Sequence, residues 1–523
     1  MNKNIPQKIV FALILLTSVS IAGAQVLSNA DIDKLVERSM KAFDVPGISI
    51  GVVKDGKVVI AKGYGVRSLN TMQKMDENTL VGIASNSKAF TSAALGMLVD
   101  EEKIKWDTKV RDVIPEFKLF DPYVTEEFTI RDLLTHRSGL GLGAGDLMLF
   151  PNGNDFTLTD IIRNLRYLKP VSSFRTKYDY DNNLYIVAGE VIARVSGKSW
   201  PEFVEERIIR PLGMTKTAAL FERLADKSNV VDPHAQVDGK VQVIERDLVR
   251  VAASAGGINS NVTDLMKWVS VLLSNGKYGD NQAKRLFSED VLREMWTPQT
   301  IIRVGDPGPY KTHFSAYGLG FGLTDVSGYK QVRHTGGLEG MVTEITMIPE
   351  LNLGIIVLTN QQEGSAFSSI SNQIKDGYLG RTGTDWVSVL STRRQKALDD
   401  AKKVTESVWQ NINVIQKAAL NKTDFGPFVG RYTDPWFGEV TLSVKDGKRW
   451  FDAKRSPKLT GEMLPYKGNS FVVKWVDRSM DADAFANFSL DQEGNPIGFT
   501  MRAISPLTDF SYDFQDLDFR RLK

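Results

Sequence analysis

The chain has 523 residues, of which 42% are hydrophobic and 24% charged, a composition typical of a soluble globular protein with a sizeable core. Lysine and arginine number 65 against 63 aspartates and glutamates, so the charge balance gives no support for nucleic acid or an anionic membrane as a partner. Cysteine is absent, which excludes disulfides, a cysteine nucleophile, thiolate metal sites and a lipidated N-terminal cysteine.

The N-terminus, residues 1–24, is typical of a secretory signal. Lys3 and Lys8 form a positive region, residues 9–16 form an unbroken apolar run, and residues 22–24 read Ala-Gly-Ala, a small-x-small cleavage pattern. The alternative, a transmembrane anchor, is disfavoured because the apolar stretch is short and contains hydroxyl residues. We predict an exported protein, periplasmic or secreted, with no membrane anchor after signal cleavage.

The next segments are predicted to form a helix and then a β-hairpin. Residues 32–40 have a helical pattern. The apolar, β-branched runs 47–53 and 58–60 flank an Asp-Gly turn, which is a strong hairpin signal.

The middle of the chain, from about residue 85 to 275, is predicted to be mostly helical, because apolar residues recur there at three- and four-residue spacing. Asn261, followed three residues later by Asp264, resembles a capping box that opens one of these helices. Strand character returns at 341–348 and 353–358. Strands at both ends with helices between them predict an α/β domain whose sheet is assembled from both ends, with an inserted helical domain.

The C-terminal part divides into a charged helical stretch and a β-rich unit. Residues 386–421 are predicted to be a helical linker, and residues 422–523 a small all-β domain, barrel or sandwich. Its tryptophans are expected in the core because large apolar rings are mostly buried. These are Trp436, Trp450 and Trp475.

The first candidate for chemistry is the pair Ser85 and Lys88, in the pattern S-x-x-K. This spacing on a helix places both side chains on one face, and the helix N-terminus favours negative charge near the serine. Apolar neighbours predict a largely buried Lys88, whose lowered pKa would let it act as, or assist, the base that activates serine. Alone the motif is weak, since an N-capping serine and a solvated first-turn lysine explain it better. Two further pairs in turn stretches share the spacing: Ser274 with Lys277, and Ser327 with Lys330.

The second candidate is Tyr180 with Asn182, just before an apolar helix that starts near Leu184. A tyrosine beside a lysine can serve as a general base, and an asparagine can bind a substrate amide and hold the lysine. The alternative is an ordinary turn with Asn182 as a cap. Asp179 and Asp181 could attract a substrate amine, but exposed turn aspartates explain them more simply.

The third candidate is the run His334, Thr335, Gly336 and Gly337, which lies between two strand-like stretches. Small residues there let a substrate approach, and one exposed N–H could complete an oxyanion hole with the N–H of Ser85. The alternative for His334 is a hydrogen-bonded histidine at a sheet edge.

Together, these three candidates resemble the serine β-lactamase and penicillin-binding-protein-like superfamily, in particular class C β-lactamases, family VIII esterases and D-aminopeptidase-like serine peptidases. The resemblance implies an α/β domain over residues 25–385, with an antiparallel sheet, flanking helices and an inserted helical domain. The C-terminal unit looks like the small lipocalin-like domain that often follows it. The segments that carry the resemblance are 83–88, 133–140, 254–257, 317–320 and, in the C-terminal unit, 430–432.

The resemblance also implies a role for each site residue. Ser85 would be the acylated nucleophile, Lys88 would keep its surroundings cationic or take its proton, and Tyr180 would be the general base. The groups that would bind substrate are Asn182, His334, Thr335 and Gly336, and the N–H groups of Ser85 and Gly337 would form the oxyanion hole.

Two histidines need separate interpretation. His334 stands where β-lactamases and DD-peptidases carry a lysine, and a histidine of ordinary pKa is mostly neutral at pH 7 and holds a carboxylate more weakly. Strong penicillinase or DD-carboxypeptidase activity is therefore disfavoured. His136 falls in a loop that matches the family as a whole and is interpreted as structural.

The sequence thus predicts an exported serine hydrolase that forms an acyl-enzyme on Ser85 and needs no metal or cofactor. We favour a peptidase or amidase acting on small or D-amino-acid-containing peptides. Carboxylesterase activity is a close second, and weak β-lactam turnover a side activity. A non-catalytic sensor of peptidoglycan fragments or antibiotics is the alternative from another class. The expected partner is a small-molecule or peptide substrate, nucleic acid is not expected, and a homo-oligomer stays open.

Overall fold

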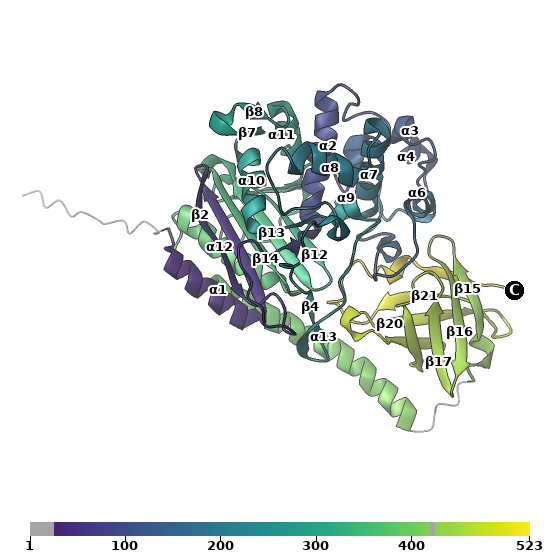
Figure 1. Cartoon of the computed structure of the whole chain (residues 1–523). Helices are drawn as coiled ribbons and strands as arrows, with labels where there is room; N and C mark the ends of the chain where they lie inside the picture. Colours follow the sequence, from purple (N-terminus) through teal and green to yellow (C-terminus); the bar gives the residue numbers. More distant parts are fainter. Residues whose placement is uncertain (1–25, 418–423) are drawn as a thin grey trace, which may run out of the picture.

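The computed structural model describes residues 26–417 and 424–523 (Figure 1). The predicted signal at residues 1–24 lies outside the described residues. Within the two described ranges, no helix combines the length and the apolar character needed to cross a membrane.

An eight-stranded antiparallel sheet forms the centre of the larger part, in the order β2-β1-β14-β13-β12-β11-β10-β9. Two strands come from the N-terminal end, β1 (Gly47–Lys54) and β2 (Lys57–Gly65). The others are β9 (Thr300–Ile302), β10 (Ser315–Tyr317), β11 (Gly322–Val326), β12 (Tyr329–Leu338), β13 (Met341–Ile348) and β14 (Leu353–Thr359). In the β1–β14 ladder Ile50 lies opposite Val357, so the prediction of one sheet built from both ends is confirmed.

Helices cover both faces of this sheet. Ile355 and Val357 of β14 pack with α1 (Asn29–Phe43) and α12 (Gly364–Tyr378). Ile356 and Leu358, which point the other way, belong to the core cluster that contains the apolar side chains of α10 (Val262–Leu273). Burial on both faces explains why β14 is an unbroken apolar run rather than an alternating one.

The inserted middle of the chain is helical, as predicted (Figure 1). Its helices besides α10 are α2 (Ser87–Asp100), α3 (Val110–Val113), α4 (Pro122–Glu127), α5 (Ile130–Leu133), α6 (Leu158–Asn164), α7 (Asn183–Ser196), α8 (Trp200–Val204), α9 (Ala253–Gly256) and α11 (Glu289–Met295). Short pairs of strands accompany them: β3 (Val81–Gly82) with β6 (Asn259–Ser260), β4 (His234–Val237) with β5 (Lys240–Val243), and β7 (Lys277–Tyr278) with β8 (Lys284–Arg285).

The predicted capping box at α10 is only half formed. The Asn261 side chain accepts a hydrogen bond from the backbone N–H of Asp264. The Asp264 carboxylate instead accepts from Lys216 and Thr217, and so joins α10 to a neighbouring loop.

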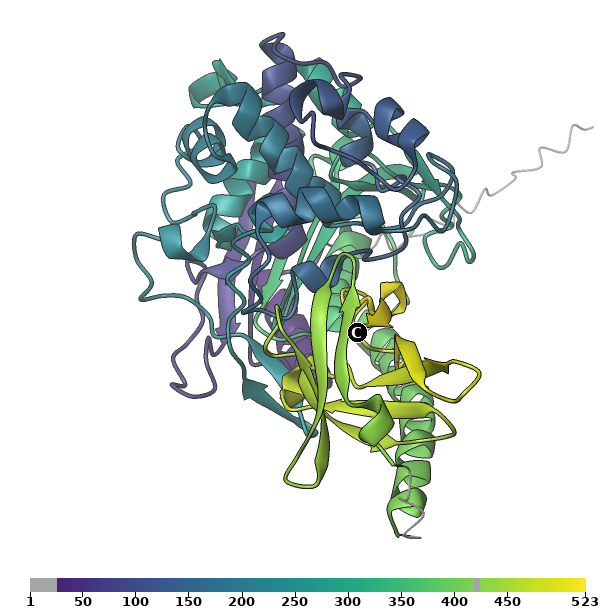
Figure 2. The same cartoon turned by 90° about the vertical axis from the view of Figure 1, so that its right-hand side faces the viewer.

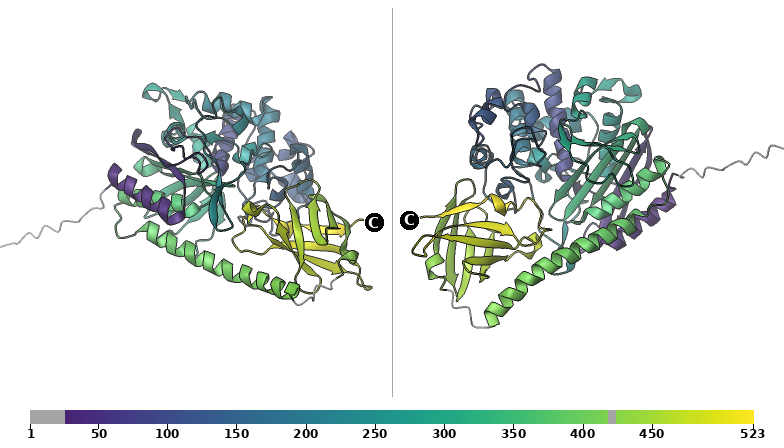
Figure 3. Two further views of the ribbon diagram at one scale, coloured as in Figure 1. Left: turned by 60° about the horizontal axis from the view of Figure 1, so that its bottom comes forward. Right: turned by 180° about the vertical axis from the view of Figure 1, so that it is seen from behind.

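A long helix, α13 (Trp386–Lys417), leads from the larger part toward the C-terminal unit (Figure 3). That unit is a closed antiparallel barrel in which the first strand pairs with the last. Its strands are β15 (Gly430–Asp434), β16 (Gly438–Lys445), β17 (Lys448–Ala453), β18 (Thr460–Pro465), β19 (Ser470–Trp475), β20 (Ala484–Leu490), β21 (Pro496–Ala503) and β22 (Asp518–Arg521).

Aromatic rings fill the core of the barrel. The ring centroid of Phe499 lies 4.7 Å from that of Phe519 and 4.9 Å from that of Phe488. Trp475 and Trp436 are buried as predicted, whereas Trp450 is only partly buried. These contacts make a packed hydrophobic core.

The barrel docks on the helical part of the larger domain (Figure 2). Asn164 at the end of α6 donates to the backbone carbonyl of Trp436 at 2.8 Å. Arg455 of the barrel forms ion pairs with Asp155 and Asp160 at 2.6 and 2.8 Å. The β21–β22 connection contributes Asp509, Phe510 and Ser511 to the wall of the cavity described next.

Candidate active site

Ser85 lies in a 3-10 turn, η1 (Ala84–Asn86), directly before α2. The preceding residue, Ala84, has φ +50°, a left-handed conformation that a residue with a Cβ rarely adopts and that concentrates at functional sites. The N-cap of α2 is Asn86, so the alternative interpretation of Ser85 as the helix cap is wrong. The turn leaves the Ser85 side chain on a cavity wall.

Lys88, one turn into α2, is fully buried, as predicted. Its Nζ lies 3.0 Å from Ser85 Oγ, 2.8 Å from Asn182 Oδ1 and 3.0 Å from the carbonyl oxygen of Ala255. Burial lowers its pKa to about 7, against the opposing charges of Asp146 and Asp181. A neutral amine has two N–H donors and one lone pair, so it can donate to the amide and the carbonyl and turn its lone pair to the Ser85 hydroxyl.

Tyr180 lies next to both Ser85 and Lys88. Lys88 Nζ lies 4.8 Å from the centroid of the Tyr180 ring, and Ser85 hydrogen-bonds to the Tyr180 hydroxyl. The ring of His136 packs against Tyr180 at 4.3 Å. Burial raises the pKa of Tyr180 well above its ordinary value, although the bond with Ser85 opposes this shift. Tyr180 is therefore a phenol at neutral pH, and Lys88 is the neighbour whose pKa is closer to neutrality.

Asn182 precedes α7 and uses both ends of its amide inside the protein. Its Oδ1 accepts from Lys88, as predicted, and its Nδ2 donates to Asp146 Oδ2 at 2.8 Å. The amide NH₂ has two donors and Asp146 takes one of them, so the second can donate to a substrate in the cavity that Asn182 lines.

The interpretation of Asp181 as an exposed turn residue is wrong, because its side chain is fully buried. Its Oδ1 caps α7 by accepting from the N–H of Leu184 at 3.1 Å, and burial raises its pKa to about 7. Asp179 forms an ion pair with Lys177 at 2.9 Å. Neither aspartate lines the cavity.

His334, on β12, has hydrogen-bond partners at both ring nitrogens. Nδ1 lies 2.5 Å from the carbonyl oxygen of Thr335, and Nε2 lies 2.7 Å from the hydroxyl of Tyr317. A carbonyl can only accept, so Nδ1 carries the proton and Nε2 accepts from the tyrosine. Burial and the charge of Lys88 lower the pKa of His334 to about 3, which leaves the ring neutral at pH 7.

These side chains surround a cavity of about 340 Å³. The predicted site residues that line it are Ser85, Tyr180, Asn182, His334, Thr335 and Gly337. Lys88 is fully buried and is not among the residues that line the cavity. At Gly337 an added Cβ would meet nothing within 4 Å, whereas at Gly336 it would lie 2.2 Å from the carbonyl oxygen of Ile83. Gly336 therefore brings β12 against the turn that carries Ser85 and does not itself face the cavity.

The sequence that forms this site matches a family model. Residues 32–376 match the model described as Beta-lactamase. The chain belongs to the beta-lactamase family. Members of this fold family are serine hydrolases. Residues 417–521 match a second model, described as a domain of unknown function (DUF3471), which covers the barrel.

Relatives of this beta-lactamase-family chain include proteins named as hydrolases. The unguisins hydrolase of Aspergillus violaceofuscus is 31% identical over 511 residues, which cover 90% of this chain and 87% of that protein. Protein flp of Staphylococcus aureus (strain N315) is 27% identical over 338 residues, covering 64% of this chain and 63% of its own. The octameric penicillin-binding protein homologue from Pyrococcus abyssi has the same fold, with a TM-score of 0.60 at 22% identity over 92% of this chain and 99% of that one.

The sequence did not reveal several residues of this beta-lactamase-family site. Asp146 follows a glycine-rich stretch that signals a turn but not the direction of a side chain. The barrel supplies part of the cavity wall through Asp509, Phe510 and Ser511, and the Phe510 ring meets Tyr180 edge-on at 5.7 Å. No sequence motif marks these barrel residues.

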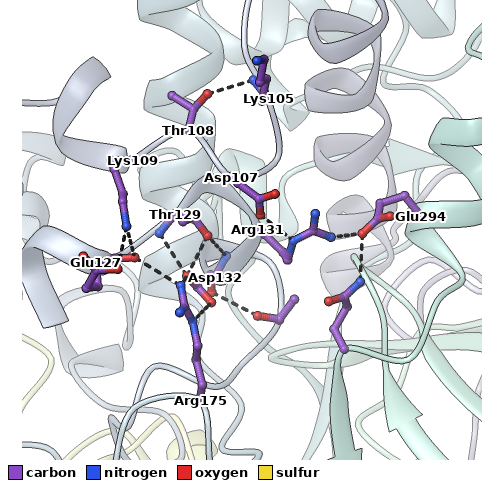
Figure 4. Close-up of polar contacts among 12 residues, drawn as sticks. Lys105, Asp107, Thr108, Lys109, Glu127, Thr129, Arg131, Asp132, Arg175 and Glu294 are labelled. Carbon is purple, nitrogen blue, oxygen red and sulfur yellow. Dashed lines mark hydrogen bonds and ion pairs between the residues drawn. The ribbon is translucent and has the colours of Figure 1, made fainter.

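A buried ion network holds the loop that leads to Tyr180. Figure 4 shows Arg175 and Thr129 converging on the carboxylate of Asp132. Arg175 approaches to 2.6 Å and Arg137 to 3.0 Å, and the Asp132 side chain is fully buried. Burial raises the pKa of Asp132, but the hydrogen bonds from Arg175 and Thr129 and the charge of Arg137 outweigh it and lower the pKa below its ordinary value. The network therefore stabilises the fold at neutral pH and is lost in acid, when Asp132 is protonated.

We expect Asp132→Ala to lower the free energy of unfolding by about 3 kcal/mol, because it leaves the Arg137 side chain, which is only 15% exposed, without its carboxylate partner. Urea unfolding followed by circular dichroism measures the change. Asp107→Ala is the matched control, because Asp107 also pairs with an arginine, Arg131, but is 77% exposed, so stability should hardly change. Equal losses of unfolding free energy in both variants would contradict the stabilising role given to the buried Asp132.

Proposed function

We propose that this chain is an exported serine hydrolase that forms an acyl-enzyme on Ser85 and acts as a peptidase or amidase on small or D-amino-acid-containing peptides. The observation that carries the proposal is the 3.0 Å contact between Lys88 Nζ and Ser85 Oγ at the cavity. Export rests on the signal pattern of residues 1–24.

The residues suggest an order of proton movements. Lys88, with a pKa of about 7, takes the proton from Ser85 as its oxygen attacks the substrate carbonyl. The N–H groups of Ser85 and Gly337 hold the resulting oxyanion. Tyr180 passes a proton to the leaving amine and is reprotonated from Lys88. Water then attacks the acyl-enzyme. Tyr180 and Lys88 move the protons in the opposite order, so that Ser85 regains its proton and the acid product is released.

The polar groups of the cavity favour a peptide over a substrate held by one carboxylate. His334 is neutral and hydrogen-bonded at both nitrogens, so it offers no fixed cation. Arg333 and Asp509 line the same cavity with opposite charges, and Phe510 adds an apolar surface. A peptide presents groups of all these kinds. Relatives named as unguisins hydrolases, aligned over 90% of this chain, support hydrolysis as the reaction class.

The proposal is tested by intact-mass spectrometry with a fluorophosphonate probe, followed by assays on D- and L-alanyl dipeptide amides, p-nitrophenyl butyrate and ampicillin. We expect one covalent adduct and a kcat/KM for a peptide amide at least about tenfold above that for hydrolysis of ampicillin. Cleavage of the ester without the amides would replace the proposal with a carboxylesterase. Persistent ampicillin acylation would indicate a penicillin-binding-like peptidase. Absence of any adduct would rule out catalysis and favour the sensor.

A further inference from the structure

A chain of buried hydrogen bonds runs from the nucleophile to the barrel. Lys88 links Ser85 to Asn182, and Asn182 donates to Asp146 Oδ2 at 2.8 Å. The same oxygen accepts from the hydroxyl of Ser511 at 2.9 Å. Asp146 is fully buried, and Ser511 is 9% exposed. The other oxygen of Asp146, Oδ1, has no partner among the described residues, so Ser511 supplies one of the two side-chain bonds seen there.

The barrel loop also fixes the backbone around Asp146. The carboxylate of Asp513 accepts from the N–H of Gly145 at 2.6 Å and of Leu147 at 2.9 Å, on either side of Asp146. At Gly143, which has φ +70°, an added Cβ would lie 2.6 Å from the carbonyl oxygen of Phe510. The two loops are therefore in direct backbone contact.

The hydrogen bonds determine the orientation of the Asn182 amide. Asn182 Nδ2 donates to Asp146 Oδ2, the oxygen that also accepts from Ser511, so the NH₂ end of the Asn182 amide faces Asp146. The amide oxygen must then face Lys88, which lies next to Ser85. We propose that Asp146 and Ser511 are positioning residues for the nucleophile: Ser511 holds Asp146, Asp146 orients the Asn182 amide, and Asn182 aims Lys88 at Ser85. This inference rests on the proposed function only in taking Ser85 as the nucleophile.

The same groups are coupled electrostatically. The titratable groups that face Asp146 are Lys88, Tyr180, Asp181 and Asp513. Burial raises the pKa of Asp146 well above its ordinary value, and the bonds from Asn182 and Ser511 act against this. Loss of the Ser511 hydroxyl therefore raises the pKa of Asp146 further and removes negative charge near Lys88. The pKa of Lys88 then falls below its value of about 7.

The test uses the full mature chain and two measurements: the rate of fluorophosphonate labelling at Ser85 against pH, and the titration of Lys88 by NMR with ¹³C-labelled lysine, assigned through a Lys88 variant. We expect Ser511→Ala to slow labelling about tenfold at pH 7 and to move the Lys88 midpoint down by roughly half a pH unit. Asp146→Asn keeps the shape but removes the charge, and should move the midpoint in the same direction with a larger loss of rate.

The controls separate positioning from a general loss of structure. Ser511→Thr retains a hydroxyl and should restore both rate and midpoint. Thr508→Ala removes a hydroxyl from the same connection, where it donates to Asp481 within the barrel, and should leave both unchanged. Wild-type behaviour of Ser511→Ala in both measurements, or an equal effect of Thr508→Ala, would overturn the proposal. If the wild type fails to label, the proposed function fails, while the Lys88 titration still decides whether Ser511 and Asp146 act on the lysine.

Discussion

Replacement of Ser85 by alanine is expected to abolish the covalent adduct and to reduce kcat/KM by roughly 10⁴–10⁶-fold. The structure explains why no neighbouring group can compensate. The Ser85 hydroxyl alone lies at the meeting point of Lys88 Nζ, 3.0 Å away, and the Tyr180 hydroxyl. Loss of this oxygen leaves an oxyanion hole with no attached acyl group. Intact-mass spectrometry and steady-state kinetics on the best substrate measure the two effects.

The matched control is Ser274→Ala, since Ser274 and Lys277 have the same sequence spacing as the active pair. Ser274 follows α10 and is not among the residues that line the cavity. Its loss should leave labelling and turnover unchanged. A Ser85→Ala protein that still forms a stoichiometric adduct would show that the nucleophile lies elsewhere.

The second large effect is expected for Lys88→Met, which retains most of the side-chain volume but removes the amine. Turnover should fall by roughly 10²–10⁴-fold, because the proton acceptor for Ser85 is lost. In the wild type, activity should fall as the pH drops below about 7, since the protonated ammonium cannot accept a proton. This acid limb of the pH–rate profile should be absent from the residual activity of Lys88→Met.

Lys375→Met provides a control with similar physical properties. Lys375 of α12 is also buried with a pKa lowered to about 7, but it donates to Gln331 and lies outside the cavity. Its replacement should leave both the turnover and the acid limb intact. Similar losses in the two variants would mean that burying any lysine matters for folding and that Lys88 has no special role.

Local patterns were sufficient to predict the sheet and the helical insertion. The runs that became β1 and β14 could be identified because apolar and β-branched residues are concentrated there, and the sheet follows from placing strands at both ends of one domain. For the C-terminal unit, the sequence did not decide between a barrel and a sandwich. The alternating pattern predicts strands but does not show whether the first strand pairs with the last.

The candidate site was predictable where the chemistry depends on short spacings. Ser85 and Lys88 are one turn apart, so their contact follows from local geometry. Asp146 and Ser511 are 365 residues apart, and only the docking of the barrel brings them together. Burial was the other missing quantity, because the raised pKa of Asp181 and the lowered pKa of His334 depend on surroundings that no local pattern contains.

The position of Ser511 has a consequence for biosynthesis. A ribosome makes Ser85, Lys88, Tyr180 and His334 before it reaches the barrel loop at residues 509–513. Until that loop docks, Asp146 lacks one hydrogen-bond partner and the cavity lacks one wall. A chain cut short before residue 509 would thus contain every residue of the catalytic motifs and still lack the assembled site. The final folding step, rather than the catalytic motifs, would then determine when hydrolysis begins.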